Sequence, residues 1–293
     1  MSVIENALKR LQGQRPAGPE PLLPEEPRQS YGTVMAAGAA RRRDNGAEAP
    51  AAAGRIIRID QDALRAAGML PPAHQEQEIA QQYRRIKRPL INHALGRGVA
   101  PLPQGNLILT TSAVPGEGKT FMSLNLAFSM RLEEDITVLL VDGDVVNPRI
   151  SQILGAENEP GLLDVVKDPT LSASNLILPT DVPGLSFLPA GRQDPNATEL
   201  LASARMFEVV NKLGSEDPAR IVLFDSAPLL VTTESQALAQ FTGQVLLVVR
   251  ADQTPQRVVF DALQTLAEGK PVSLVLNQNL HRLHSGYYEQ YGA

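Results

Sequence analysis

Short apolar runs alternate with helix-like segments through most of the chain. The runs are residues 106–112, 137–142, 220–225, 244–250 and 272–277, and helical patterns lie around 119–132, 198–213, 233–240 and 256–268. Near-continuous apolar strands separated by helices are typical of a parallel sheet covered on both faces. The pattern predicts an α/β fold with a doubly wound, mostly parallel sheet. Residues 184–190 are a candidate for a further strand. Residues 76–95 look helical, and Pro89 predicts a break or kink there.

Residues 1–54 differ from the rest of the chain in composition and hydrophobic pattern. Residues 2–12 place apolar side chains on one helical stripe, at Val3, Ile4, Ala7, Leu8 and Leu11. This stripe predicts an amphipathic helix over residues 1–12 that docks on a membrane surface or a partner, and a terminus without function explains it almost as well. Residues 13–54 are rich in Pro, Ala, Gly and Arg and cannot bury enough apolar surface to offset the entropy of ordering. We therefore predict a disordered linker there.

Bulk composition narrows the class of protein. The 293 residues suit one large domain with appendages, and 43% hydrophobic residues is ordinary for a globular chain. A net charge of −5 gives no basic field for nucleic acid. The chain has no cysteine and no apolar run near the ~20 residues that a membrane-spanning helix needs. We expect a soluble cytoplasmic protein that reaches a membrane through a partner or a surface contact.

The first strand runs directly into the sequence PGEGKT, and a helix follows. Glycines let backbone N–H groups close around phosphates, the helix N-terminus favours negative charge, and the Lys and Thr contact phosphates and Mg²⁺. This pattern predicts a sheet of the P-loop NTPase type that binds a nucleotide with Mg²⁺. The candidate binding residues are Gly116, Glu117, Gly118, Lys119 and Thr120. Ala113 stands where the strict pattern has Gly.

Three aspartates stand at the ends of two further strands. Asp142 ends one apolar run and Asp144 follows it closely, while Asp225 ends another run. The carboxyl ends of parallel strands meet at the crevice where the P-loop lies. Each aspartate alone could cap the next helix, but three of them in a chain with GEGKT favour Mg²⁺–nucleotide chemistry. Arg149 fits a helix cap, a surface ion pair or a phosphate contact, and the sequence does not distinguish these.

The sequences VPGEGKT, VLLVDGDVVNPR and IVLFDSAP resemble the Walker A, Walker A′ and Walker B motifs of bacterial tyrosine kinases. These are P-loop autokinases of polysaccharide export with a tyrosine-rich C-terminal tail. The resemblance covers roughly residues 76–293. AGRQDPNATELLASARM and QQYRRIKRPL also resemble the exopolysaccharide-locus branch associated with exosortase systems, which lacks a fused transmembrane domain.

The resemblance implies a site, with ATP as the nucleotide. Lys119 and the loop amides would stabilise charge on the transferring phosphoryl group. Asp142 would bind Mg²⁺ and act as base on the tyrosine hydroxyl, Asp144 would help to hold the metal, and Asp225 would hold it directly or through water. Asn277, at the end of the last strand, resembles the residue that reads adenine in related P-loop proteins.

Three of the five tyrosines gather at the end of the chain, at Tyr287, Tyr288 and Tyr291. They resemble the autophosphorylation cluster of the family, which is offered to the active site of a neighbouring subunit. The composition changes at about Arg55, and together with the resemblance this predicts a kinase domain at 55–280, a tail at 281–293 and a homo-oligomer. The resemblance also implies a membrane-embedded polysaccharide co-polymerase-type partner that holds the kinase at the inner membrane, and a role in regulating exopolysaccharide synthesis or export.

One motif departs from the family, and two other functions stay open. The family often carries Glu-x-x-Arg-x-x-Arg for oligomerisation, and the best match here is Gln81, Arg84 and Lys87, which fits an interface or a solvated basic helix face. A partitioning or cell-division ATPase switch shares the fold. It carries a lysine where this chain has Val114, and it gives the tyrosine tail no role. A nucleotide-binding regulatory subunit of a polysaccharide transporter would use the same binding residues.

Overall fold

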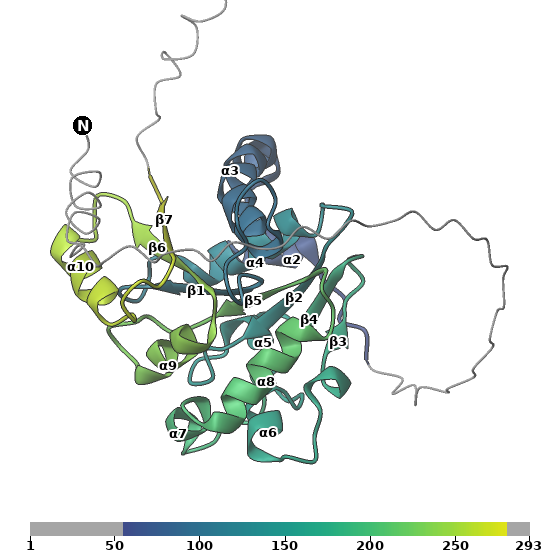
Figure 1. Ribbon diagram of the computed structural model, residues 1–293. Helices are drawn as coiled ribbons and strands as arrows, with labels where there is room; N and C mark the ends of the chain where they lie inside the picture. The colour runs from purple at the N-terminus through teal and green to yellow at the C-terminus, as the bar shows by residue number, and fades with distance from the viewer. Residues whose placement is uncertain (1–54, 280–293) are drawn as a thin grey trace, which may run out of the picture. The chain divides into compact units, whose positions relative to one another are not determined.

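The computed structural model describes residues 55–279 and confirms the predicted α/β class (Figure 1). Its sheet of seven strands has the order β3-β4-β2-β5-β1-β6-β7, and all neighbours are parallel except β3 and β4. The strands are β1 (Leu107–Ser112), β2 (Thr137–Asp142), β3 (Leu178–Pro179), β4 (Leu185–Leu188), β5 (Arg220–Asp225), β6 (Gln244–Arg250) and β7 (Val272–Asn277). The α-helices are α2 (Gln61–Ala66), α3 (Glu76–Leu95), α4 (Lys119–Met130), α5 (Arg149–Ile153), α6 (Leu162–Lys167), α7 (Ala197–Leu201), α8 (Ala204–Ser215), α9 (Thr233–Phe241) and α10 (Gln256–Gln264). Two 3-10 turns, η1 (Ala73–Gln75) and η2 (Ala173–Asn175), complete the described elements.

Helices cover both faces of the sheet because its central strands are apolar on both sides. In β6, Leu246 and Val248 belong to the core formed with α3 and α4, whereas Val245 belongs to the core formed with α8 and α9. Figure 1 shows α3 and α4 on one side of the sheet and α6 and α8 on the other. Strands buried on both faces are what a parallel sheet with crossover helices requires.

The order of the strands reverses at β1, which β5 and β6 flank. The chain passes from β1 to β2 on the far side of β5, and later crosses from β5 to β6 on the opposite side of β1. In open α/β sheets, ligands bind outside the carboxyl ends of the strands at such a reversal. At this edge the P-loop follows β1, Asp142 and Asp225 are the last residues of β2 and β5, and Asp144 comes two residues after β2 ends.

Three helix predictions differ from the structure. Of the predicted break or kink at Pro89, the break is wrong, because α3 continues through Pro89 while Leu90 and Ile91 pack in the core beside α4; the kink stays a prediction. The segment predicted as one helix at 198–213 is two, α7 and α8. Ser203 caps the second of these by accepting a 3.2 Å hydrogen bond from the Met206 amide. The last predicted helix ends at Gln264, before residue 268.

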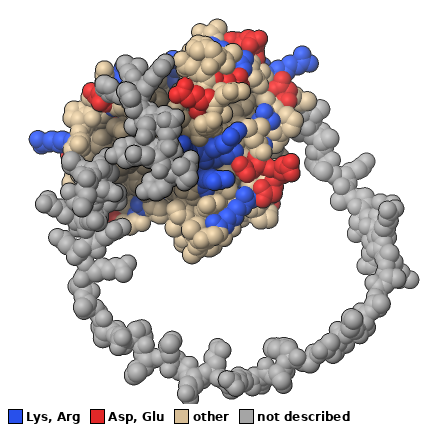
Figure 2. All heavy atoms as spheres, turned by 90° about the horizontal axis from the view of Figure 1, so that it is seen from above, with Lys and Arg blue, Asp and Glu red and all other residues tan. Residues whose placement is uncertain are grey.

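Several predictions concern residues outside 55–279. The amphipathic helix at 1–12, the linker at 13–54 and the tail at 281–293 lie there, so the predicted division of the chain stays a prediction. Within the described part, no helix is both long and apolar enough to span a bilayer. On the face shown in Figure 2, basic and acidic side chains are interspersed.

Candidate active site

The loop between β1 and α4 has the shape that its glycines predict. Gly116 and Gly118 adopt left-handed conformations with φ of 84° and 91°, a region that residues with side chains rarely occupy. At Gly118, a Cβ atom would also lie 2.1 Å from Nδ2 of Asn277. The α4 helix begins at Lys119, directly after these glycines. The loop therefore opens onto a helix N-terminus, where the backbone favours an anion.

Glu117 braces this loop from within. Its buried carboxylate accepts hydrogen bonds from the Val114 amide (2.9 Å), the Arg250 amide (3.2 Å) and the Thr254 hydroxyl (2.5 Å). The Glu117 side chain is thus occupied by hydrogen bonds within the protein, so only the backbone of Glu117 remains for the predicted contact with a nucleotide. Ala113 is fully buried in an apolar cluster, so the protein accommodates its methyl group where the strict pattern has Gly.

Asp142 and Asp225 stand opposite each other in the register of β2 and β5, and both are fully buried. Asp225 accepts hydrogen bonds from the hydroxyls of Thr120 and Ser123, each 2.8 Å long. The Oδ2 atom of Asp142 accepts two, from the amide and the hydroxyl of Ser151, also at 2.8 Å. Its Oδ1 atom has no partner within residues 55–279. A buried carboxylate oxygen without a partner is costly, so this atom suits contact with a ligand.

Lys119 is the cation of the cluster. Its Nζ atom lies 3.0 Å from Oδ2 of Asp144, and the two side chains are only 13% and 6% exposed. The other oxygen of Asp144 accepts a 3.1 Å hydrogen bond from the Asn147 amide. The structure therefore brings the predicted residues into one cluster at the carboxyl ends of β1, β2 and β5, which we call the carboxyl-end cluster. Its members are Lys119, Thr120, Asp142, Asp144 and Asp225.

Burial and close charges shift the pKa values of these groups. Burial raises the pKa of Asp142 to about 7; the charge of Asp225 adds to this, and the Ser151 hydrogen bonds oppose it. Burial also raises the pKa of Asp225, although the charge of Lys119 works against it. For Lys119, burial lowers the pKa, but the charges of Asp225 and Asp144 outweigh burial and the net shift is upward. The lysine stays charged at neutral pH, and Asp142 has a pKa suited to accepting a proton there.

The oxygen atoms of this cluster fit Mg²⁺. They are a hydroxyl and carboxylates, the hard ligands that this ion prefers. Within residues 55–279, no three acidic or histidine side chains converge to form a complete metal site. Mg²⁺ usually keeps several waters and shares its remaining ligands with substrate phosphates. The unpartnered Oδ1 atom of Asp142 is a candidate ligand.

The remaining predicted residues have mixed outcomes. Asn277 lies on the P-loop, where its Nδ2 donates a 2.8 Å hydrogen bond to the Glu117 carbonyl, and its contact with adenine stays a prediction. Arg149 is exposed at the start of α5 and forms no ion pair with any residue that the structure describes. The tail tyrosines Tyr287, Tyr288 and Tyr291 lie outside the described residues.

The three residues matched to the oligomerisation motif do not share one environment. Gln81 and Arg84 are exposed on α3. Lys87 is buried, with its ammonium 2.7 Å from both the Ser129 carbonyl and the Glu133 carboxylate. Lys87 therefore joins α3 to the end of α4 within one chain, and a fully solvated basic face is wrong for this residue.

Two residues of the site were missed from the sequence. Ser123 stands three positions after Thr120 on α4, and this spacing places both hydroxyls on one helical face, so the signal was present. Ser151 contacts Asp142 from α5, and its hydroxyl also accepts a 3.2 Å hydrogen bond from the Ala190 amide. The local sequence does not identify this serine as a site residue, because its contact with Asp142 depends on how the five-residue helix α5 packs against β2.

No family model matches the chain. The chain is 32% identical over 192 residues to EpsB of Ralstonia nicotianae, named as a tyrosine-protein kinase, and the match covers 64% of this chain and 25% of EpsB. The chain thus spans about a quarter of the length of the first curated relatives that it matches.

A shorter relative and a solved structure match more completely. CapB of Staphylococcus aureus, also named as a tyrosine-protein kinase, is 30% identical over 187 residues, which cover 63% of this chain and 80% of CapB. The crystal structure of the VpsO kinase domain matches with a TM-score of 0.57 and 27% identity, covering 71% of this chain and all of that domain. The cluster described above lies within this P-loop fold, and the chain belongs to the family of bacterial tyrosine-protein kinases.

Proposed function

We propose that the protein transfers a phosphoryl group from ATP to tyrosine at the carboxyl-end cluster. The observation that carries this proposal is the charge balance beside the P-loop, where three carboxylates share one lysine and one buried carboxylate oxygen is unpartnered. A site of this kind suits a nucleotide that arrives with a divalent cation. The names of the relatives and of the VpsO kinase domain support the same activity.

Each side chain then has a role in the reaction. The tyrosine oxygen forms a bond to the γ-phosphorus, the bond from that phosphorus to the ADP oxygen breaks, and Asp142 takes the hydroxyl proton. Lys119 and the amides of residues 116–120 hold the phosphates. Asn277, which donates a hydrogen bond to the Glu117 carbonyl of the P-loop, would contact the base. Thr120, Asp144 and Asp225, with Asp142, would hold Mg²⁺. When bound, Mg²⁺ neutralises charge on the phosphates.

The proposal extends to residues beyond the described part of the chain. Tyr287, Tyr288 and Tyr291 are the acceptors, and a second copy of the chain phosphorylates them in a homo-oligomer. The motif resemblance supports a role in exopolysaccharide synthesis or export, with residues 55–280 as the kinase domain. The apolar stripe at residues 2–12 supports docking of this cytoplasmic protein at the inner membrane, through a membrane-embedded polysaccharide co-polymerase-type partner.

One experiment tests the reaction and its acceptors. The full chain is incubated with Mg-ATP and followed by intact mass and peptide mapping. We expect phosphate on the tail, and little phosphotyrosine when the three tail tyrosines are changed together to Phe. ADP formed without phosphotyrosine would favour the ATPase switch, and neither product would favour the regulatory subunit. Phosphate found mainly on Tyr31 or Tyr83 would contradict the tail assignment.

A mixing experiment tests transfer between copies. The Lys119→Ala chain keeps its tail but lacks the lysine, and the triple Phe chain keeps the active site but lacks acceptors. We expect phosphotyrosine to form on the Lys119→Ala chain only when the two are mixed. Phosphate that forms in neither mixture nor single sample, while the unmodified chain is phosphorylated, would show transfer within one chain.

A further inference from the structure

The two loops that lead out of the carboxyl-end cluster expose apolar side chains. Ten large apolar side chains are exposed in residues 55–279, and three of them lie in residues 143–148 and 226–232, which make up only 13 of the 225 described residues. They are Val146 (56% exposed), Leu230 (39%) and Val231 (57%). Single exposed apolar residues are ordinary, whereas exposed apolar residues that gather beside a polar site are typical of a contact surface.

Backbone hydrogen bonds place both loops at the edge of the cluster. In the first loop, Val146 stands between Asp144 and Asn147, and the Asn147 amide donates a 3.1 Å hydrogen bond to the Asp144 carboxylate. In the second loop, the Leu230 amide donates a 3.3 Å hydrogen bond to the carbonyl of Ala113, where the P-loop starts. The two loops start side by side, because β2 and β5 are paired up to their last residues. We call three side chains the apolar rim: Val146, Leu230 and Val231.

A cation stands beside the apolar rim. Arg149 follows the first loop directly, as the first residue of α5. Two positions before it, the Asn147 amide contacts Asp144, and two positions after it, Ser151 contacts Asp142 through its amide and its hydroxyl. Arg149 is exposed and forms no ion pair within residues 55–279. An unpaired positive charge therefore lies next to a cluster in which carboxylates outnumber cations.

The proposed acceptor segment has the chemistry that complements this surface. Residues 285–293, SGYYEQYGA, contain three aromatic rings, one acidic residue and no basic residue. The acid, Glu289, stands two positions after Tyr287 and two positions before Tyr291. Residues two apart lie on the same side of an extended segment. Either tyrosine can therefore enter the cluster while Glu289 faces the same surface.

We propose that Arg149 and the apolar rim recognise the acceptor segment of a second copy of the chain. The ring of Tyr287 or Tyr291 packs against the apolar rim, and the Glu289 carboxylate pairs with Arg149. The cluster itself repels an acidic segment, because its three carboxylates share Lys119, so Arg149 supplies the attraction. This inference rests on the proposed function and adds its specificity, which is a tyrosine with an acidic residue two positions away.

A charge exchange between two chains tests the pairing. The kinase chain carries the three tail changes to Phe and the acceptor chain carries Lys119→Ala, so transfer runs from the first to the second. Arg149→Glu in the kinase chain, or Glu289→Lys in the acceptor chain, should lower kcat/KM for the acceptor chain about tenfold or more, because each places like charges together. The two changes combined should restore kcat/KM to within about threefold of the parent pair.

A matched control and a second readout complete this experiment. Arg58 is also exposed and without an ion pair in the described part of the chain, but it lies beside β3 at the far edge of the sheet, and Arg58→Glu should change kcat/KM by less than about twofold. Nucleotide affinity should be unchanged in Arg149→Glu. A loss of nucleotide affinity that Glu289→Lys does not compensate would assign Arg149 to the phosphates and overturn the pairing.

The parent pair distinguishes failure of this inference from failure of the proposed function. Transfer in the parent pair with unchanged kcat/KM in both single variants overturns the recognition by Arg149 alone. Absence of phosphotyrosine in the parent pair overturns the proposed function, and this inference with it.

Serine substitutions test the apolar rim. Val146 and Val231 are more than half exposed, so changing both to Ser should leave the fold intact. The KM for the acceptor chain should rise about fivefold or more with kcat nearly unchanged, since apolar contact with the tyrosine ring is lost. Leu132→Ser is the control, because this residue is 63% exposed beyond the far end of α4, and its KM should match the parent. An unchanged KM in the double variant, or a fall in kcat alone, overturns the role of the apolar rim.

Discussion

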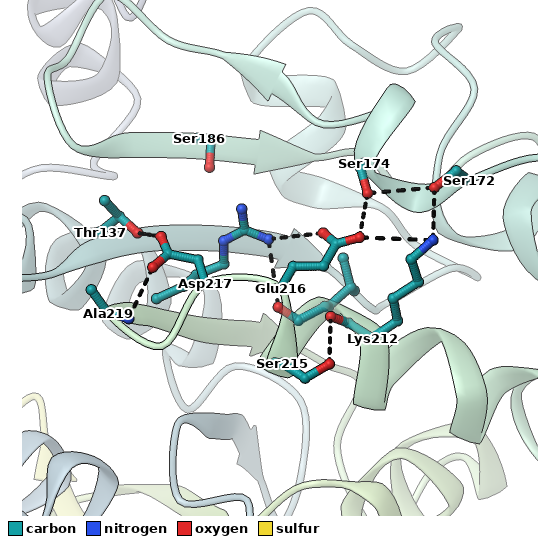
Figure 3. Close-up of polar contacts among 12 residues, drawn as sticks. Thr137, Ser172, Ser174, Ser186, Lys212, Ser215, Glu216, Asp217 and Ala219 are labelled. Atoms are coloured by element: carbon teal, nitrogen blue, oxygen red, sulfur yellow. Dashed lines mark hydrogen bonds and ion pairs between the residues drawn. The ribbon is translucent and has the colours of Figure 1, made fainter. Parts of the chain in front are cut away.

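Strands β2 and β5 begin in one polar cluster and end in another, and the two clusters treat charge differently. The amino-end cluster consists of Thr137, Lys212, Glu216, Asp217 and Arg220. Figure 3 shows Thr137, Lys212, Glu216 and Asp217 with the neighbouring Ser172 and Ser174. Glu216 contacts Arg220 at 3.4 Å and Lys212 at 3.8 Å and accepts a 2.6 Å hydrogen bond from Ser174. Asp217 accepts hydrogen bonds from Thr137 and the Ala219 amide. Both carboxylates are satisfied by groups of the protein itself.

The carboxyl-end cluster has the opposite balance. Asp142 and Asp225 are fully buried, and together with Asp144 they share a single lysine. The Oδ1 atom of Asp142 has no partner in the described part of the chain. Similar residue types thus neutralise one another at the amino ends of the strands, whereas at the carboxyl ends the carboxylates outnumber the cations. The comparison indicates that binding chemistry lies where the protein does not satisfy its own charges.

The largest expected difference concerns the two lysines. Lys119→Ala should lower phosphotransfer by about a hundredfold to a thousandfold or more, because it removes a preorganised positive charge at the phosphates. Lys212→Ala, at the amino-end cluster, should leave the rate within about twofold, since its charge pairs only with an exposed network. Initial rates with Mg-ATP measure both. Similar losses in the two variants, with both chains folded, would contradict the functional division.

The second difference concerns pH and stability. The pKa of Asp142 rises from 3.8 to about 7 on folding. The folded state therefore binds the proton more tightly, so this contribution to stability is complete below the unfolded pKa and is lost as pH rises through about 7. Asp142→Asn should then raise the free energy of unfolding at pH 8 by about 2–4 kcal/mol, at roughly 1.4 kcal/mol for each pKa unit, and by much less at pH 4.

Urea unfolding of the nucleotide-free chain with a chelator, between pH 4 and 8, measures this effect. The matched control is Asp217→Asn at the amino-end cluster, which should change stability by no more than about 1 kcal/mol at any of these pH values. Asp142→Asn should also reduce phosphotransfer strongly, since the proton acceptor is lost. If the Asp142→Asn variant is less stable than the parent at pH 8, burial of the ionised Asp142 carboxylate does not destabilise the folded state.

The sequence predicted the carboxyl-end cluster better than its surroundings. Strand-end aspartates and GEGKT follow directly from chain order, because a parallel sheet brings all carboxyl ends to one edge. Ser151 and the brace made by Glu117 could not be predicted, since each depends on how separate loops return to the sheet. The break at Pro89 was wrong because local preference was outweighed by packing of Leu90 and Ile91. The strands could be predicted from the local sequence, whereas contacts between residues far apart in the chain could not.

A third difference concerns two glutamates that accept several hydrogen bonds. Glu117→Gln replaces one buried acceptor oxygen by an NH₂ group that would face N–H or O–H donors. We expect a loss of about 1–3 kcal/mol in stability, the range for a buried group left unsatisfied. Nucleotide affinity should fall as well, because the loop loses its internal brace. Equilibrium unfolding measures the change in stability, and nucleotide titration measures the change in affinity. An unchanged nucleotide affinity would show that the P-loop keeps its shape without the hydrogen bonds of Glu117.

The smallest effect is expected for the same change at the amino-end cluster. Glu216→Gln keeps the shape of the side chain and removes the charge that contacts Arg220 and Lys212. The Glu216 side chain is 25% exposed, so water screens the ion pairs and solvates the freed cations. Exposed pairs of this kind contribute about 0–1 kcal/mol, and that small loss should shrink further in high salt. Unfolding measured at low and high salt tests this, with Glu117→Gln alongside. A loss at Glu216 that equals the loss at Glu117 and persists in high salt would remove the distinction between the two ends of the strands.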